Sequence, residues 1–371
     1  MKIAYLANVR FPSERAHAAQ IAHNCEAFVQ AGSEVDLYVT ENANASELKV
    51  AEQFGFTPHF SVTTLPPQWL YPRYKISFYV REFIFAFAFF FRKRPGQYDI
   101  IYARSEWILW LLSFFVKSSQ LVWESHEAKF NLAARRLLQK GVKVVVISQG
   151  IKKYYETHAV PAEQLLVAED GIDDGFYAQV LDRSVAREKL GLDRDDFIAM
   201  YIGGFDVWKG IHTFFEAAQH APDVRFVAIG GSESEIVVLH AQYPTVQFLG
   251  SKPYRELRNY QQAADVLVVP NTAKELLSSH YTSPLKLFAH MASGVPMVVT
   301  DIPSLISVVQ SPQVTVCAPD NPIDMGNAIM EVRAHYEEKK SAAEDLKSSA
   351  RKYTWKERAS LIKSFLLREV S

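Results

Sequence analysis

Short apolar runs, separated by polar or helical stretches, recur along the whole chain of 371 residues. Helical patterns lie between several of these runs, and one of them, residues 17–32, ends on a glycine. Near-continuous apolar strands that alternate with helices indicate parallel sheets covered on both faces. The predicted strands span residues 2–8, 34–40, 60–66, 98–104, 120–126, 143–148, 197–204, 224–231, 246–250, 265–271 and 296–301. We therefore expect an α/β protein built from doubly wound parallel sheets.

The chain length and one turn-rich segment predict two domains. At about 150 residues per domain, the chain has room for two. Residues 168–184 are polar and rich in turn formers, so we place the boundary near Gly171. The predicted domains are residues 1–170 and 171–354, each Rossmann-like. Because ligands of such sheets bind beyond the carboxyl ends of the strands, the cleft between the domains is the expected site.

Composition excludes several classes of protein. The net charge of −1 gives no reason to expect nucleic acid as a partner. Cys25 and Cys317 are the only cysteines, which is typical of a protein from a reducing cytoplasm rather than of a disulfide scaffold. The N-terminal apolar run is broken by polar residues and does not resemble a signal peptide. The longest apolar runs, 83–91 and 107–116, are shorter than the ~18 residues of a membrane span.

Residues 279–301 have the pattern of a helix that begins at an anion site. Ser283 is a good N-cap, Pro284 suits the first helical position, and Gly294 is a natural stop. The unpaired amides of a helix start favour phosphate, and Lys286 adds a mobile cation. The alternative is an ordinary capped helix before a buried strand.

A second segment, residues 201–218, joins a strand to a helix through glycines. Gly203 and Gly204 allow a ligand to approach the backbone closely, and Lys209 stands where the helix is expected to begin. The alternative is a plain strand–turn–helix joint with a surface lysine.

Two more loops follow predicted strands in this half, one with Gly230 and one with Ser251 and Lys252. The carboxyl ends of parallel strands lie at one edge of a sheet, so these loops are expected to converge with the helix start at residue 285. Their convergence favours a nucleotide site.

In the first half, Glu124 and His126 stand at the end of an apolar strand. A strand-end histidine beside carboxylates is suited to contact a sugar or to handle a proton. The alternative is a hydrogen-bonded residue with no part in the chemistry, and of the two active roles we favour binding. Residues 13–20 follow the first strand and are expected to cap a phosphate or line an acceptor pocket, and Asp170 closes this half.

The sequence contains no metal-binding or hydrolase motif. No Asp-x-Asp occurs, and His17 and His23 are wrongly spaced for one helix face. Neither a Gly-x-Ser-x-Gly elbow nor a P-loop is present, which argues against a hydrolase of that type and a P-loop kinase. We expect no metal and no cofactor.

Taken together, these segments resemble the family-4 retaining glycosyltransferases of the GT-B fold, over nearly the whole chain. The similar segments are "SHEA" (125–128), the run from Val144 to Asp173, "GGFDVWKG" (203–210), residues 248–271, residues 283–301 and the closing segment 353–370. The resemblance implies that the last helix, in residues 355–371, packs back onto the first domain.

The chain departs from the family pattern at three positions. Gly204 stands where the family has an arginine, and Tyr281 and Ala289 stand where it has two glutamates. The second glutamate of the family holds the donor ribose. Its loss removes a charge-assisted hydrogen bond of about 1.5–3 kcal/mol, which weakens donor binding about ten- to a hundredfold. Ala289 is either a natural difference or an introduced substitution.

The resemblance implies transfer of a sugar, with retention and without a metal, from a UDP- or GDP-linked donor to a saccharide or lipid-linked acceptor. Catalytic roles fall on His126 and Lys209. The implied donor-binding residues are Gly203, Gly204, Gly230, Ser251, Lys252, Thr282, Ser283, Leu285 and Ala289. The implied acceptor-side residues are Ser13, Arg15, His17 and Arg104. The alternatives are a catalytically silent sugar-nucleotide-binding protein and another GT-B enzyme such as a nucleotide-sugar epimerase.

Residues 70–94 combine aromatic residues with six bases and one acid, Glu82. This pattern predicts a peripheral contact with a membrane that brings a lipid-linked acceptor to the enzyme, which gives a cytoplasmic protein at the inner membrane face. The alternative is a buried core helix with a basic cap, which we favour for residues 83–91.

Overall fold

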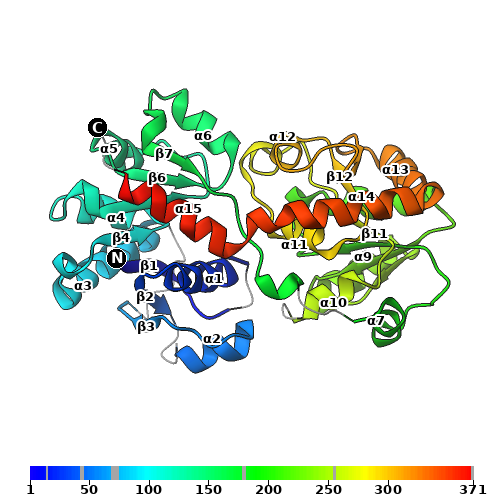
Figure 1. Cartoon of the computed structure of the whole chain (residues 1–371), viewed down its shortest axis with the longest axis horizontal. Helices are drawn as coiled ribbons and strands as arrows, with labels where there is room; N and C mark the ends of the chain where they lie inside the picture. Colours follow the sequence, from blue (N-terminus) through cyan, green and yellow to red (C-terminus); the bar gives the residue numbers. More distant parts are fainter. Residues whose placement is uncertain (14–15, 42–45, 68–74, 178–180, 254–255, 369–371) are drawn as a thin grey trace. The chain divides into compact units, whose positions relative to one another are not determined.

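The computed structural model describes residues 1–13, 16–41, 46–67, 75–177, 181–253 and 256–368. The chain divides into two compact units. Unit 1 contains Met1–Asp170 together with the terminal segment from Trp355, and unit 2 contains Gly171–Thr354 (Figure 1).

Unit 1 is built on a sheet of seven parallel strands in the order β3-β2-β1-β4-β5-β6-β7. The strands are β1 (Lys2–Arg10), β2 (Glu34–Glu41), β3 (Ser61–Thr64), β4 (Ile100–Ala103), β5 (Leu121–Ser125), β6 (Lys143–Val146) and β7 (Leu165–Val167). The six strands predicted in this half are confirmed. The sequence missed β7, which has three residues, of which only Leu165 is buried.

Helices α1 (Ala16–Gln30), α2 (Glu47–Phe54), α3 (Lys75–Lys93), α4 (Glu106–Leu112), α5 (Leu132–Gln139) and α6 (Gln149–Glu156) connect these strands. Short 3-10 turns span Pro95–Gln97, Ser118–Gln120 and Ala162–Gln164. The terminal helix α15 (Trp355–Leu367) lies along α1 (Figure 1), where Lys363 Nζ donates to the carbonyl of Ala31 at 2.5 Å. The end of the chain therefore completes the first unit.

Helix α3 differs from both readings of residues 70–94. Phe85 and Phe89 are buried, whereas Phe87 and Phe91 are exposed. Arg81, which we had counted among the bases of a membrane contact, is buried and donates to Asn8 Oδ1 at 2.8 Å. That assignment is therefore wrong for Arg81. Two other bases of the stretch, Arg73 and the side chain of Lys75, lie outside what the structure describes.

Unit 2 contains a sheet of six parallel strands in the order β10-β9-β8-β11-β12-β13. The strands are β8 (Ile198–Ile202), β9 (Arg225–Ile229), β10 (Val246–Phe248), β11 (Val266–Val269), β12 (Met297–Thr300) and β13 (Thr315–Cys317). The helices are α7 (Arg183–Leu190), α8 (Ile211–Ala217), α9 (Glu233–Gln242), α10 (Leu257–Gln261), α11 (Leu285–Ser293), α12 (Pro303–Ile306), α13 (Pro322–Ala334) and α14 (Tyr336–Ser349). The five strands predicted here are confirmed, and β13 was missed.

Alternate residues of the central strands of unit 2 enter two separate cores. Ile198, Met200 and Ile202 of β8 join one apolar cluster, whereas Ala199 and Tyr201 join the other. Because successive side chains of a strand point to opposite faces, the sheet is covered on both sides. Both units are thus doubly wound parallel α/β folds, which confirms the predicted fold class.

The joint between β8 and α8 depends on a glycine that touches the neighbouring strand end. Gly210 has φ +68°, and a Cβ built on it would lie 1.8 Å from the carbonyl oxygen of Pro270. Gly191 has the similar φ of +65°, but nothing lies within 4 Å of its Cβ position. Replacing Gly191 by alanine therefore tests the cost of the left-handed conformation alone, whereas replacing Gly210 adds the cost of the steric contact with Pro270.

We expect Gly191→Ala to lower the free energy of unfolding by about 1 kcal/mol, since only the left-handed conformation is disfavoured. Gly210→Ala is expected to lower it by a further 1–3 kcal/mol or so, because the β8–α8 and β11 loops must move apart. Urea denaturation followed by circular dichroism measures both. Equal losses for the two variants would show that the Gly210–Pro270 contact does not constrain the joint.

Candidate functional site

The loops that follow β8, β9 and β10 touch one another at the carboxyl edge of the unit 2 sheet. The amide of Gly203 donates to the carbonyl of Ile229 at 2.9 Å, and the amide of Gly230 donates to the carbonyl of Gly250 at 3.0 Å. Ser251 Oγ donates to the carbonyl of Gly231 at 3.0 Å. The predicted convergence of these three loops is confirmed.

The contact between the first two loops requires glycine. Gly230 has φ +139°, and a Cβ on it would lie 1.9 Å from the carbonyl oxygen of Gly203. No other residue fits there without moving the loop. The β8 turn is therefore held against the β9 turn by close backbone contact, and the ring of Phe205 packs against Gly231.

Two lysines and one carboxylate surround the turn after β8. Lys209 Nζ lies 2.6 Å from Asp206 Oδ2, and both side chains retain solvent exposure. Lys286 Nζ, from the first turn of α11, donates to Tyr201 Oη at 3.0 Å. The tyrosine hydroxyl in turn donates to the carbonyl of Gly204 at 2.7 Å.

This arrangement corrects one expectation about the cations. Lys286 is not mobile, because it is held on Tyr201, with its Nζ 4.3 Å from the ring centroid. Burial, followed by the charge of Lys209, lowers the pKa of Lys286 well below its ordinary value. The pKa of Asp206 is lowered, chiefly by its hydrogen bond from Lys209. Lys209 and Lys286 therefore both interact electrostatically with one carboxylate, Asp206.

Helix α11 begins later than the sequence predicted. It spans Leu285–Ser293, Pro284 occupies the N-cap position, and no side chain caps the helix. The prediction that Ser283 is the N-cap is therefore wrong. A turn of π-helix, Leu277–Tyr281, precedes α11, and the two residues that follow this turn, Thr282 and Ser283, are buried. Ala289 is partly buried and packs against the apolar core of this unit. Helix α11 contains no carboxylate in its first two turns.

Asn271, directly after β11, is a candidate that the sequence reasoning passed over. Its side chain is fully buried, and neither amide atom has a hydrogen-bond partner in the part of the chain that the structure describes. Strands β8 and β11 are neighbours in the sheet, and the strands that follow each of them in sequence extend the sheet in opposite directions. Ligands of such sheets bind at this switch point. A buried polar group without a partner is uncommon, and this one stands at the switch point of the sheet. An asparagine at a strand end gives no such signal in the sequence.

In unit 1, a buried carboxylate organises the residues after β5. Glu124 Oε1 lies 2.6 Å from His126 Nε2, and Glu124 Oε2 lies 3.2 Å from a terminal guanidinium nitrogen of Arg358 on α15. Tyr102 donates to the same oxygen, and Arg358 also donates to Asn24 Oδ1 at 2.8 Å. The terminal helix therefore supplies the counter-charge of the strand-end carboxylate, and this role of Arg358 left no signal in the sequence.

The charges of this cluster set the state of the histidine. Burial alone would raise the pKa of Glu124, but the charge of Arg358 and the hydrogen bond with His126 hold it below its ordinary value. Burial, and then the charge of Arg104, lowers the pKa of His126 to about 4. At neutral pH the imidazole is uncharged and donates its Nε2–H to the carboxylate. Its Nδ1 lone pair remains able to accept a hydrogen bond from a hydroxyl.

The structure places the remaining acceptor-side predictions only in part. Arg104 follows β4 and belongs to the Glu124 cluster through its charge. Ser13 and His17 flank the start of α1 and are partly buried, and Arg15 lies outside the described residues. Over the described residues, no three His, Cys, Asp or Glu side chains gather as a metal site would require.

The comparisons with known proteins agree with this geometry. Residues 196–335, which carry the glycine loops and both lysines, match the family model of glycosyl transferases group 1. A putative teichuronic acid biosynthesis glycosyltransferase of Bacillus subtilis, TuaH, is 26% identical over 214 residues, which cover 56% of this chain and 52% of the relative. A second one, TuaC, is 27% identical over 163 residues, 43% of this chain and 39% of the relative. The chain thus matches about half or less of the length of these relatives.

Solved structures define the fold. Sucrose-phosphate synthase from Thermosynechococcus elongatus is similar with a TM-score of 0.79 over 98% of this chain and 97% of that chain, at 20% identity. HepE from Anabaena, solved in complex with UDP-glucose, is similar with a TM-score of 0.73 over 99% of both chains, at 19% identity. The two Rossmann-like parallel sheets are those of a GT-B fold.

Asp170 yields a test of the unit 1 cluster. Its carboxyl accepts a hydrogen bond from Gln20, and burial raises its pKa to about 7 although Arg358 opposes the rise. The ordinary value of 3.8 applies in the unfolded chain, so the unfolded chain loses this proton first as the pH rises. This group therefore lowers the free energy of unfolding between about pH 4 and 7, by up to about 1.4 kcal/mol per pH unit.

We expect Asp170→Asn to remove this contribution, because the amide keeps the acceptor for Gln20 but does not titrate. Urea denaturation at pH 5, 6 and 7 measures the slope of stability against pH for the variant and the wild type. Asp345→Asn, on the exposed side of α14, is the matched control and should keep the wild-type slope. An unchanged slope in Asp170→Asn would contradict the raised pKa.

Proposed function

We propose that this protein is a retaining, metal-independent glycosyltransferase that moves a sugar from a nucleotide-sugar to a saccharide or lipid-linked acceptor in polysaccharide or glycoconjugate synthesis. The observation that carries the proposal is the glycine turn at Gly203 and Gly204, beside which the ammonium groups of Lys209 and Lys286 lie. It lies within the residues that match the group 1 glycosyltransferase model. The names of the relatives support the same class of reaction and a role in cell-envelope polysaccharide.

The turn is suited to a diphosphate. Gly203 and Gly204 carry no side chain, and two lysines lie beside the turn against one carboxylate, so the turn favours an anion. Burial lowers the pKa of Lys286, and a diphosphate beside it would favour its ammonium form. We propose a UDP-linked donor first, since HepE was solved with UDP-glucose.

During transfer, negative charge grows on the leaving diphosphate as the bond from the anomeric carbon to the phosphate oxygen breaks. Lys209, Lys286 and the first amides of α11 stabilise that charge where it develops. The anomeric carbon becomes oxocarbenium-like, the acceptor oxygen bonds to it from the same face, and the leaving phosphate takes the acceptor's proton. Configuration is thereby retained, and no step needs a metal.

His126 serves binding in this proposal. Because it is neutral and its Nε2–H is given to Glu124, its Nδ1 accepts a hydrogen bond from a sugar hydroxyl. Arg358 and Glu124 hold the ring in that orientation. The acceptor is a saccharide or a lipid-linked saccharide, and the proposal includes a peripheral contact of unit 1 with the membrane.

A second candidate function is a catalytically silent sugar-nucleotide-binding protein. Gly204, Tyr281 and Ala289, which stand where the resembling family has charged residues, favour it. The two functions differ in one observable. Mass spectrometry of donor incubated with lipid and sugar acceptors shows transfer or slow donor hydrolysis for the enzyme, and unchanged donor for the silent protein.

Isothermal titration with UDP, GDP and ADP tests the donor site. We expect one of them to bind, and Lys209→Met to weaken its binding by at least about tenfold, since a charge-assisted contact of about 1.5–3 kcal/mol is lost. Lys274→Met is the matched control, because Lys274 is an exposed lysine of the same unit. Absence of binding by all three nucleotides at millimolar concentration would refute the proposed function.

Restoring a carboxylate to α11 tests the assignment of Ala289. Ala289→Glu is expected to tighten nucleotide binding about ten- to a hundredfold, since it adds a charge-assisted hydrogen bond to the ribose. Ala289→Gln, of the same size but neutral, should gain less. If both variants bind like the wild type, residue 289 does not contact the ribose.

A further inference from the structure

Aromatic side chains of α3 and of the segment after α4 pack into one surface of unit 1. The ring of Phe90 lies 4.9 Å from that of Phe115, and Phe87 stacks on Phe91 at 6.2 Å, both between ring centroids. Phe114 and Phe115 follow one another after the last turn of α4. We call Phe87, Phe91, Phe114 and Phe115 the aromatic surface.

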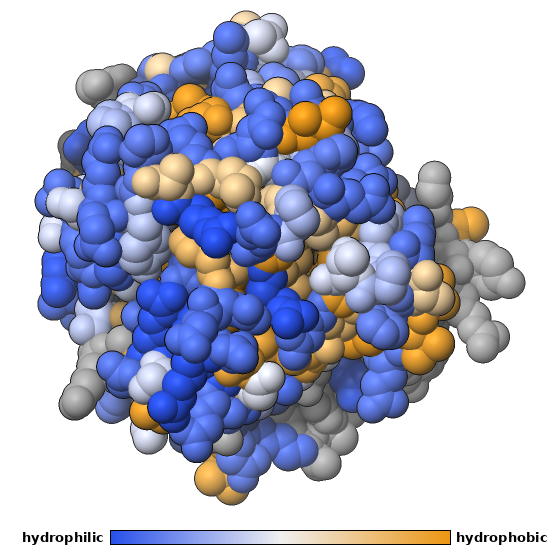
Figure 2. Space-filling model, turned by 90° about the vertical axis from the view of Figure 1, so that its right-hand side faces the viewer, coloured by the Kyte–Doolittle hydropathy of each residue, from blue (hydrophilic) through white to orange (hydrophobic). Residues whose placement is uncertain are grey.

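The aromatic surface faces solvent. Phe91 is 75% exposed, Phe115 58%, Phe114 50% and Phe87 43%. Phe85 and Phe89, on the opposite side of the same helix, are buried in the core. Packing of α3 on the core therefore does not explain why the helix also carries aromatic rings on its exposed side. The face drawn in Figure 2 is by contrast largely hydrophilic, with apolar side chains in small groups. Exposed aromatic clusters of this size mark interaction sites.

Basic side chains border the aromatic surface. Arg92, Lys93 and Arg94 follow Phe91 directly, and the guanidinium of Arg136 lies 3.9 Å from the ring centroid of Phe114. The carboxylates within α3 and α4 are Glu82 and Glu106, and both are buried. The charge that α3 and α4 present beside these rings is therefore positive.

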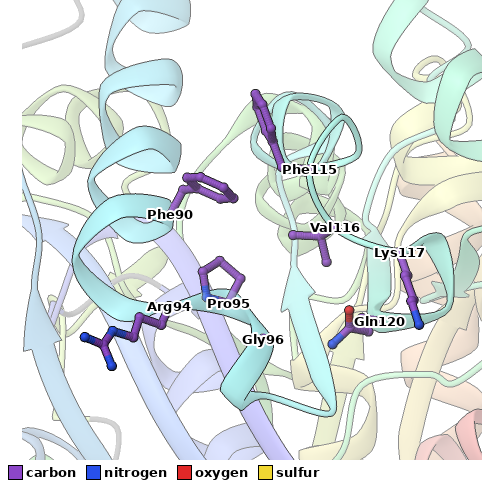
Figure 3. Close-up of a pocket in the computed structure, with 8 residues that line it drawn as sticks. All are labelled: Phe90, Arg94, Pro95, Gly96, Phe115, Val116, Lys117 and Gln120. Atoms are coloured by element: carbon purple, nitrogen blue, oxygen red, sulfur yellow. The ribbon is translucent and has the colours of Figure 1, made fainter.

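A cavity of about 430 Å³ opens between the end of α3 and the segment after α4 (Figure 3). Phe90, Phe115 and Val116 supply apolar walls, and Arg94 and Lys117 lie on opposite sides of it (Figure 3). None of the residues predicted to bind donor or acceptor lines it. The cavity thus offers apolar walls, with one base at each side of its rim.

We propose that the aromatic surface docks on an anionic lipid bilayer, with its rings in the interfacial layer and Arg94 and Lys117 on separate headgroup phosphates. Aromatic rings beside basic side chains are the composition that binds at such an interface. No helix of the described residues is long and apolar enough to cross a bilayer. The inference rests on the proposed function in one respect, because docking brings a lipid-linked acceptor to unit 1.

Charge favours a bilayer over a second copy of the chain. A two-fold contact through the aromatic surface would bring Arg94, Lys117 and Arg136 of one copy against the same residues of the other. Like charges held together away from water oppose such a dimer, whereas anionic lipid neutralises them.

Co-sedimentation tests the proposal with vesicles of phosphatidylcholine alone and of an equimolar mixture with phosphatidylglycerol. We expect the full chain to pellet with the mixed vesicles, to stay in solution with the neutral ones, and to be released by salt. Arg94→Gln with Lys117→Gln should weaken binding roughly thirtyfold, about fivefold for each base. Phe91→Ser with Phe115→Ser should abolish it.

Matched controls come from unit 2. Val237→Ser with Val238→Ser removes two apolar side chains of similar exposure on α9, and Arg194→Gln with Lys274→Gln removes two exposed bases. Both pairs should bind vesicles like the wild type, and circular dichroism confirms that every variant folds. Nucleotide binding, measured without vesicles, is expected to survive all four double substitutions, so loss of the donor site and loss of membrane docking are distinguishable.

Three outcomes overturn the proposal. They are failure to pellet with mixed vesicles, equal pelleting with neutral vesicles, and wild-type binding by both unit 1 variants. A dimer in sedimentation velocity that Phe91→Ser with Phe115→Ser dissociates, together with no vesicle binding, would assign the aromatic surface to a second copy instead.

Discussion

Parallel strand pairing is the constraint on which both units depend. Every connection must return to the same end of the sheet, so all carboxyl strand ends, and the loops that leave them, gather at one edge. In unit 2 this brings the loops after β8, β9 and β10 into hydrogen-bonding contact through Gly203, Gly230 and Gly250. Close approach there excludes any side chain at Gly230. The ammonium groups of Lys209 and Lys286 lie beside Gly204 and Gly203 of the same turn.

The charges around this turn are unbalanced in a way that matters for binding. Asp206 is paired with Lys209, while Lys286 is hydrogen-bonded to the neutral hydroxyl of Tyr201. Burial disfavours the ammonium form of Lys286, so an incoming anion relieves a cost that the free protein carries. The proposed diphosphate would therefore meet a cation, Lys286, whose nearest hydrogen-bond partner is a neutral hydroxyl.

In unit 1, the central electrostatic feature is a buried carboxylate, Glu124. Glu124 is fully buried and remains ionised because Arg358, 234 residues further along the chain, lies beside it. A buried charge without its partner is strongly destabilising. The fold of unit 1 therefore depends on α15, which packs against α1 and brings Arg358 to Glu124 at the end of β5. The neutral state and the orientation of His126 follow from this pair. The orientation of His126 is thus coupled to α15.

The amino-acid sequence alone determined the parallel strands, the doubly wound class, the glycine turn with Lys209 and the strand-end His126, because periodicity and local spacing encode them. It did not reveal β7 or β13, which have three residues each, whereas the equally short β10 was recognised because its apolar run continues to Leu249. Nor did it show that α11 begins after Ser283, that Lys286 is held by Tyr201, that Asn271 is buried without a partner, or that Arg358 neutralises Glu124. Those facts were decided by tertiary structure, since each depends on contacts between residues far apart in the chain or on burial that no local pattern reports.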